Sequence, residues 1–181
     1  MPTSRHLARL IATLALALPF AAGAIAPLDE AQALWHAGKQ AEAIAAVERL
    51  VAQSPNEARP RFALAVMRME RGETDTAAKL FTALTQDFPD LADPFNNLAV
   101  ILAARGELDA AHQALEQAVR LQPDHVLAQE NLGDILLRMA ARAYELAAKL
   151  PSATQAQAAV KLARSRELIA SNAGNARSDK R

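Results

Sequence analysis

Histidines are the side chains of this chain best suited to hold a metal ion or to transfer a proton. Apart from His6 near the N-terminus, they are His36, His112 and His125. None has a second histidine three or four residues away, the spacing that places two imidazoles on one helix face around a metal. The chain has no cysteine, so no thiolate can complete a zinc site and no disulfide can form. We therefore predict no metal site and no cofactor.

Two pairs of carboxylates are close enough in sequence to consider for general acid–base chemistry. Glu107 and Asp109 follow a glycine, and we interpret them as favouring the start of a helix. Glu130 and Asp134 share one helix face, which we interpret as the solvated edge of a groove in preference to a cation site. No Gly-x-Ser-x-Gly turn or glycine-rich phosphate loop is present. The sequence therefore predicts no catalytic residues, and we expect a protein that is not an enzyme.

The elements that position these side chains recur at a constant interval along the sequence, the interval that separates Gly38 from Gly72. Glycines permit the positive φ of a tight helix–helix turn, alanines permit close helix approach, and prolines end a helix. A period of this length is typical of a repeat array, which more often provides a docking surface than a reaction site. Five columns keep the interval: Gly38, Gly72 and Gly106; Pro55, Pro89 and Pro123; Ala43, Ala77 and Ala111; Leu64, Leu98 and Leu132; Ala31, Ala65, Ala99 and Gly133.

The columns resemble the tetratricopeptide repeat (TPR), and one unit carries the pattern best through Leu98-Ala99, Gly106, Ala111, Leu115, Ala118 and Pro123. The alternative is an unrelated helical bundle, which five columns in register make improbable. The resemblance implies an all-α solenoid of helix–turn–helix units that winds as a right-handed superhelix. We place its units at residues 28–57, 58–91, 92–125 and 126–150.

The fourth unit departs from the pattern because its turn is missing. Ala140 stands where a glycine is expected and Gln157 where a proline is expected, while Pro151 comes six residues early. Apolar residues continue at helical spacing without interruption, so we predict one long helix over 127–149. We expect a capping helix over 152–171 that folds back on it, followed by a flexible tail over 172–181.

The N-terminal segment has the pattern of a secretory signal peptide. Arg5 and Arg9 precede an uncharged apolar run over 10–20, and Ala22-Gly23-Ala24 supplies a small-residue cleavage site. We predict cleavage after Ala24, which leaves a TPR domain over 25–171 and no membrane span. An uncleaved anchor is the rival interpretation, but the apolar run is shorter than the about 20 residues that span a bilayer.

Charge does not indicate nucleic-acid binding. Without its two N-terminal arginines the chain has 18 basic and 20 acidic residues, so no strongly basic surface is expected. The chain is similar to small exported periplasmic TPR proteins of Gram-negative bacteria, and we expect the same location.

The resemblance also implies where a partner binds, because the first helix of each TPR unit lines the concave side of the superhelix. Lysines and arginines of the family's clamp for C-terminal carboxylates are replaced here by apolar and acidic residues. We therefore expect a protein or peptide partner with apolar and basic residues, bound as a helix or extended segment. The residues expected in this groove are Trp35, Phe62, Val66, Met69, Asn96, Val100, Ala103, Glu130, Asp134 and Leu137.

The expected function is a non-catalytic adaptor or scaffold in the bacterial cell envelope. A second hypothesis is a structural oligomer that assembles through the two C-terminal helices.

Overall fold

The structure, a computed structural model, describes residues 27–151 and 153–178. Within these residues the chain forms eight helices and no strand. The helices are α1 (Pro27–His36), α2 (Gln40–Gln53), α3 (Ala58–Glu70), α4 (Thr74–Asp87), α5 (Ala92–Ala104), α6 (Leu108–Leu121), α7 (Val126–Lys149) and α8 (Gln155–Ser178).

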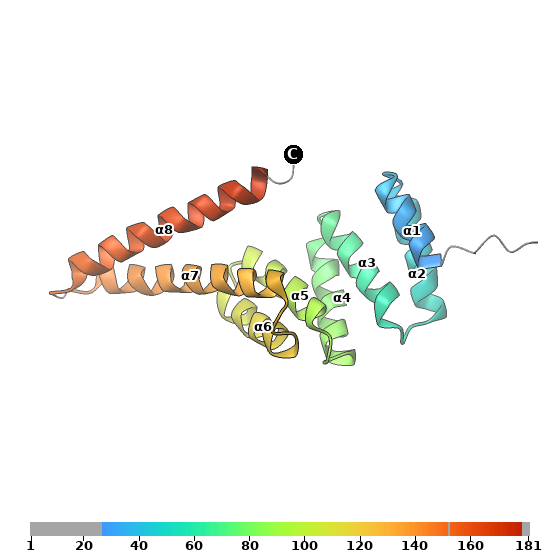
Figure 1. Cartoon of the computed structure of the whole chain (residues 1–181), viewed down its shortest axis with the longest axis horizontal. Coiled ribbons are helices and arrows are strands. Elements are labelled where there is room, and N and C mark those ends of the chain that lie inside the picture. The colour runs from blue at the N-terminus through green and yellow to red at the C-terminus, as the bar shows by residue number, and fades with distance from the viewer. Residues whose placement is uncertain (1–26, 152, 179–181) are drawn as a thin grey trace, which may run out of the picture.

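The first six helices form three helix–turn–helix units that stack along the long axis of the molecule (Figure 1). Each unit packs α1 on α2, α3 on α4 or α5 on α6, and the second helix of a unit then packs on the first helix of the next. Helix α7 continues the stack, extends beyond it, and is followed by α8, which returns alongside α7 (Figure 1). The prediction of an all-α solenoid is confirmed.

The turn inside each unit is built on a glycine with a left-handed backbone. Gly38, Gly72 and Gly106 have φ of 78°, 79° and 80°. At each turn the glycine N–H bonds to the carbonyl three residues back, and the next N–H bonds to the carbonyl five residues back. This is the Schellman arrangement, which satisfies the last carbonyls of the first helix and reverses the chain. The glycine column therefore has the structural role that its period predicts.

Prolines end the second helix of each unit. Helices α2, α4 and α6 stop two residues before Pro55, Pro89 and Pro123. The next helix begins three residues after the proline, and Pro60 and Pro94 lie in the first turns of α3 and α5, where a missing N–H costs nothing. Helix boundaries thus follow the proline and glycine columns along the array.

The core lies between the helix layers in three connected clusters, one for each unit. Its largest fully buried apolar side chains include Phe81, Leu84 and Leu115. The alanines of the repeat columns are also fully buried, which lets neighbouring helices approach closely. Apolar burial between units therefore holds the array together.

The fourth unit has the single long helix that the sequence predicts, α7. Its companion α8 continues to Ser178, seven residues beyond the expected end at residue 171. Pro151 lies in the turn between α7 and α8, where it cannot interrupt either helix.

No helix among the described residues combines the length and the apolar character needed to cross a bilayer. The predicted signal peptide, residues 1–24, lies outside the described residues.

Candidate functional site

Two cavities open along the first helices of the units. One, which we name the N-terminal pocket, lies between α1, α3 and the start of α5 and has a volume of about 510 Å³. The other, which we name the C-terminal cleft, lies between α5, α7 and α8 and has a volume of about 550 Å³. Both are large enough to receive several side chains of a ligand. Helix α5 lines both cavities, with its first turn in one and its last turns in the other.

Trp35, Phe62 and Val66 from the expected groove line the N-terminal pocket. The indole Nε1 of Trp35 donates a 2.8 Å hydrogen bond to Oε2 of Glu70 one unit further along. The ring of Phe62 packs edge-on against the buried ring of Phe81, with centroids 5.7 Å apart. Packing and hydrogen bonding therefore fix both aromatic rings, and each remains half-buried.

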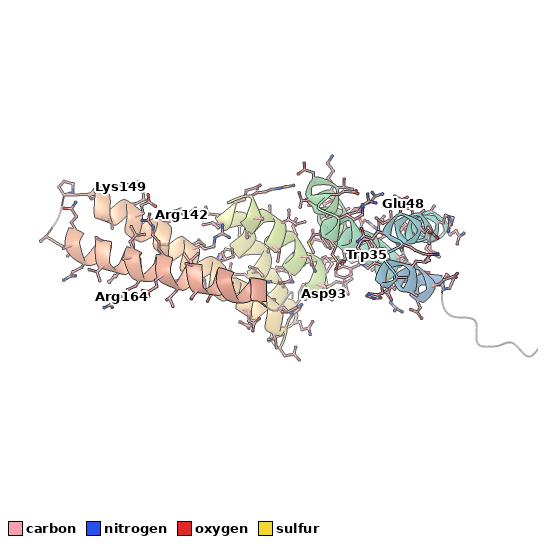
Figure 2. All side chains as sticks on the ribbon, turned by 90° about the horizontal axis from the view of Figure 1, so that it is seen from above. Trp35, Glu48, Asp93, Arg142, Lys149 and Arg164 are labelled. Atoms are coloured by element: carbon pink, nitrogen blue, oxygen red, sulfur yellow. The ribbon has the colours of Figure 1, made fainter. Side chains whose placement is uncertain are left out.

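The rim of the N-terminal pocket carries charges of both signs. Glu70 and Asp93 are acidic and Arg59 is basic, and all three side chains are exposed. Oδ1 of Asp93 accepts a 3.1 Å hydrogen bond from Nε2 of His125. Nδ1 of His125 in turn accepts the backbone N–H of Ala128 at the start of α7. Figure 2 marks Trp35, which comes from α1, and Asp93, which comes from the first turn of α5. The pocket thus combines an apolar floor with carboxylates at its edge, which suits an apolar side chain next to a cation.

Four other expected groove residues, Val100, Ala103, Asp134 and Leu137, line the C-terminal cleft. The remaining three lie in neither cavity. Asn96 is only 6% exposed and accepts a 2.9 Å hydrogen bond from the side chain of Asn131. Met69 packs against the core of α3 and α4, and Glu130 is exposed outside the cleft.

Asparagines 97 and 131 share a repeat position but not a role. The side-chain amide of Asn97 donates to the carbonyl of Asp93 in its own helix. Asn131 differs because it donates to the side chain of Asn96, one unit back. A buried amide requires a partner, and the neighbouring amide supplies it. Asn96 is therefore a contact between units and has little surface for a ligand.

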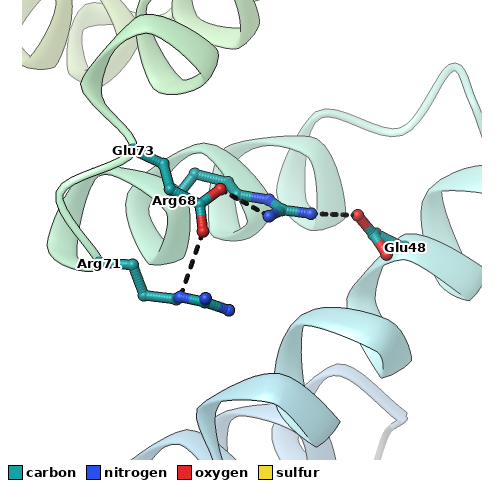
Figure 3. A network of polar contacts seen from close by, with 4 residues as sticks. All are labelled: Glu48, Arg68, Arg71 and Glu73. Carbon is teal, nitrogen blue, oxygen red and sulfur yellow. Dashed lines mark hydrogen bonds and ion pairs between the residues drawn. The ribbon is translucent and has the colours of Figure 1, made fainter.

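A charged network not anticipated from the sequence joins α2, α3 and the start of α4 (Figure 3). The Arg68 guanidinium bonds to Glu48 on α2 and, at 2.6 Å, to Glu73, which also accepts from Arg71 at 3.2 Å. The hydrogen bond to Glu73 contributes most to raising the pKa of Arg68 above its ordinary value, against partial burial. The contact between Arg68 and Glu48 joins two helices across 20 residues of sequence and has no local signal, so only the tertiary structure reveals it.

The acidic pair at 107 and 109 lies at the start of α6, as the sequence predicts, but Asp109 has a further role. Glu107 occupies the N-cap of α6, but its side chain makes no capping hydrogen bond. Asp109 instead accepts two bonds, at 2.7 and 2.9 Å, from the guanidinium of Arg142 on α7. The Arg142 guanidinium thereby lowers the pKa of Asp109 below its usual range. Asp109 braces two helices, and its partner on the next helix outweighs the local capping preference.

Among the described residues, no cluster of three or more histidine and carboxylate side chains is arranged to hold a metal ion. What the geometry offers is two apolar cavities whose margins carry charged side chains of both signs.

Two models of the family described as tetratricopeptide repeat match the sequence, at residues 28–92 and 68–133. None of the curated protein sequences compared with this chain matches it. Several solved structures are similar.

YrrB, described as a TPR protein with an unusual peptide-binding site, is 28% identical over 57% of this chain and 54% of its own, with a TM-score of 0.53. The chain thus spans about half the length of YrrB.

The Yersinia enterocolitica chaperone SycD, solved in complex with a peptide of the translocator YopD, is 19% identical over 62% of this chain and 92% of its own, with a TM-score of 0.58. MamA from Desulfovibrio magneticus RS-1 is 17% identical over 80% of this chain and 75% of its own, with a TM-score of 0.56. These two likenesses concern the fold alone.

The matched repeats, residues 28–133, comprise more than half of the chain and end within α7. Residues 28–133 of the chain therefore consist of tetratricopeptide repeats.

Proposed function

We propose that this chain is a non-catalytic protein-interaction module that binds a segment of a partner protein in its N-terminal pocket. The observation that carries the proposal is the pair of fixed, half-buried aromatic rings, Trp35 and Phe62, facing an open cavity. Rigid aromatic side chains give a large contact area at small entropic cost. The likeness to YrrB, a TPR protein with a peptide-binding site, supports the same kind of ligand.

The chemistry of the pocket selects the partner segment. An apolar side chain of the partner packs on the apolar floor of the pocket, because this contact removes the apolar surface of both molecules from water. The second carboxylate oxygen of Glu70 lies at the rim, since only Oε2 accepts from Trp35. A lysine or arginine next to the apolar anchor would pair with this rim. The partner is therefore a segment with apolar and basic residues, bound extended or as a helix.

Site-specific photo-crosslinking tests the location even while the partner is unidentified. Gln32 lines the N-terminal pocket on α1, and Gln86 is an equally exposed glutamine on α4, the second helix of its unit. A photo-reactive phenylalanine analogue at residue 32 should capture a protein in cells, whereas the same analogue at residue 86 should not. Capture through residue 86 and not through residue 32 would overturn the proposed site.

We also propose that the protein is exported to the cell envelope of a Gram-negative bacterium after removal of residues 1–24. The support is the basic start, the apolar run and the small-residue site of the sequence. The intact mass of the protein from the envelope fraction should correspond to a chain that begins at Ile25. A mass that retains residues 1–24 would contradict the proposal and favour an N-terminal anchor.

A second candidate function is self-assembly through the C-terminal helices. One observation favours it: Leu136 and Leu146 of α7 are 47% and 61% exposed, and Leu150 at its C-cap is 62% exposed. The spacing of Leu136 and Leu146 is that of an a and a d position in neighbouring heptads, as in a coiled-coil seam. Light scattering of the mature chain distinguishes the two functions. A monomer at micromolar concentration contradicts assembly, and a dimer that Leu146→Glu dissociates supports it.

A further inference from the structure

The two ends of the molecule carry opposite net charge. Over residues 27–125, which form the three units, the sequence has 9 basic and 15 acidic residues, whereas over residues 126–181 it has 9 basic and 5 acidic. The molecule is elongated, with α1 and the N-terminal pocket toward one end and the α7–α8 pair at the other (Figure 1). Opposite charges at opposite ends favour an encounter between the unlike ends of two copies.

Helix α8 presents a stripe of apolar and basic side chains that does not face α7. Its described buried residues, Ala158 and Ser165, mark the side that packs on α7. Val160, Arg164 and Leu168 follow one another at steps of four residues, so they form a stripe along a different side. Val160 and Leu168 are 53% and 54% exposed. This stripe therefore suits a contact with a surface that is apolar and acidic.

Arg164 is the cation of this stripe, and it has no partner among the described residues. Its basic neighbours on α8 do have partners, since Arg166 pairs with Glu145 at 3.3 Å and Lys161 lies 5.5 Å from the ring centroid of Tyr144. Arg164 is exposed and projects away from α7 (Figure 2). Its guanidinium therefore keeps all of its donors for a carboxylate of another molecule.

The N-terminal pocket contains a stripe of the same length with complementary chemistry. Phe62, Val66 and Glu70 recur at steps of four residues along α3, and all three line the pocket. Each stripe covers eight residues of helix, or about 12 Å at about 1.5 Å per residue. Trp35 bonds to Oε2 of Glu70, which leaves Oε1 for a guanidinium.

The cations near Glu70 do not neutralise it. Arg68 and Arg71 are its neighbours in sequence, but both pair with the carboxylate at the N-cap of α4. Arg59 lines the same pocket at the opposite end of α3, about 16 Å along the helix axis. His36 is also in the lining and makes no ion pair with Glu70. The end of the pocket at Glu70 thus offers a carboxylate beside an apolar floor.

We propose that the N-terminal pocket of one copy binds the α8 stripe of a second copy, so that copies of this chain join head to tail. The inference rests on the proposed function of the pocket and names its partner segment. Arg164 pairs with Glu70, and Val160 or Leu168, one turn away, packs on Val66. The stripe lies at the far end of its own copy, so the contact forms between copies (Figure 1). Pocket and stripe are different surfaces, so each added copy leaves one of each free and the assembly stays open.

Sedimentation velocity of the full mature chain tests this contact by charge reversal. The mean mass should rise continuously with concentration at low salt and should not stop at a dimer. Arg164→Glu should weaken association by at least about tenfold, because it brings like charges together. Arg120→Glu is the matched control, since Arg120 is another exposed arginine without a partner among the described residues and lies on α6. It should change affinity by less than about twofold.

The complementary change in the pocket identifies the pair. Glu70→Arg should weaken association as Arg164→Glu does, and the double variant should recover affinity to within about threefold of the unmodified chain. Glu70→Gln keeps an acceptor for Trp35 and should weaken association by about threefold, which covers the case in which Glu70→Arg does not fold. Thermal unfolding of each variant shows whether the fold is retained.

Trp35 reports whether the contact occupies the pocket. It is the single tryptophan of the chain, and its indole bonds to Glu70. Its emission should change with concentration in the unmodified chain and in Arg120→Glu, but not in Arg164→Glu.

Three results would overturn the proposal: a monomer at about 100 μM, unchanged association of folded Arg164→Glu, or a folded double variant that associates no better than either single variant. Association that Leu146→Glu abolishes without a change in Trp35 emission also overturns it, because the contact then lies between C-terminal helices. The crosslink at residue 32 separates this proposal from the proposed function. An adduct of twice the chain's mass supports head-to-tail contact. An adduct with a different protein, formed by a monomeric chain, overturns that contact and retains the proposed function.

Discussion

Helices α3–α6 and the α7–α8 extension use similar residues but bury them very differently. The array contains Phe81, Leu84 and Leu115 with almost no exposed surface, whereas the buried residues among the described side chains of α8 are the small Ala158 and Ser165. Each helix in the middle of the array packs on its partner and on a neighbouring unit, while α8 packs mainly on α7. Burial in a solenoid therefore depends on having neighbours on two sides, and a terminal helix lacks one of them.

Contacts between units repeat with the period of the sequence. Trp35 bonds to Glu70, Asn131 to Asn96 and Arg138 to the carbonyl of Ala103, in each case from one unit to the next. Between α7 and α8 this regular spacing along the sequence is lost. Several contacts of the extension join residues that are close in sequence around the Pro151 turn. The array should therefore respond to mutation more strongly than the extension does.

The largest expected effect is in the array core. Phe81→Ala should lower the free energy of unfolding by about 3–5 kcal/mol, because it leaves a cavity beneath Phe62. Leu168→Ala in α8 is the matched truncation in the extension, where Leu168 is 54% exposed. It should change stability by less than about 0.5 kcal/mol. Urea denaturation measures both, and equal losses would contradict the comparison.

Glycine should have opposite roles in the two regions. Gly106→Val should destabilise by about 1–2 kcal/mol, because a branched side chain must adopt φ near +80°. A Cβ at this position would meet no atom within 4 Å, so the cost comes from the backbone alone. Gly133→Ala, inside α7 with equally open space, should stabilise by about 0.5–1 kcal/mol. Thermal unfolding that shifts both variants in the same direction would show that this assignment is wrong.

The caps of α6 and α7 give a smaller contrast. His125 accepts the N–H of Ala128 through Nδ1, so His125→Ala should lower stability by about 1 kcal/mol. Glu107 occupies the equivalent N-cap of α6 without a side-chain bond, so Glu107→Ala should change little. Chemical denaturation compares the two variants. A loss for Glu107→Ala as large as for His125→Ala would mean that helix-end charge, and not the cap bond, sets the effect.

The smallest effect concerns pH. Arg142 lowers the pKa of Asp109 in the folded state, so the Asp109–Arg142 pair stabilises above the ordinary carboxyl pKa, and this contribution is lost as pH falls through the lowered value. Arg142→Gln should therefore unfold more readily than the unchanged chain at neutral pH and equally in strong acid. Both groups are exposed, so the difference is small and decreases with salt.

Lys149→Gln is the control for that titration, because Lys149 pairs with Glu145 inside one helix. Lys149 lowers the pKa of Glu145, as Arg142 lowers that of Asp109, but the Lys149–Glu145 pair does not join two helices. Acid titrations of unfolding should show a larger change for Arg142→Gln than for Lys149→Gln. The reverse order would mean that the brace between α6 and α7 adds no more than a local pair.

Local chemistry made most of the fold predictable. Glycine at 38, 72 and 106 reverses the chain because φ is positive there, and proline at 55, 89 and 123 ends the helix before it. Both are properties of one residue and its neighbours, so a single sequence reveals them. The long helix α7 was predictable for the same reason, since its middle contains neither the glycine nor the proline that ends a helix elsewhere in the array.

The candidate site was predictable only in part. The resemblance to the TPR family implied that Trp35, Phe62 and Val66 share one surface, and they line one pocket. It also placed Asn96 there, although the amide is buried against Asn131. Periodicity gives the helix face on which a residue lies, but the accessible surface depends on how far the next unit covers that face.

The sequence by itself thus determined the repeat and its helix boundaries, because these depend on backbone preferences and a fixed spacing. Only the tertiary structure decided that the first helices of the units line two cavities, the N-terminal pocket and the C-terminal cleft. It also decided that α8 forms a wall of the cleft and that Arg142 joins Asp109 across two helices. These features come from contacts between side chains that are distant in sequence, whose geometry is fixed only when the units have stacked.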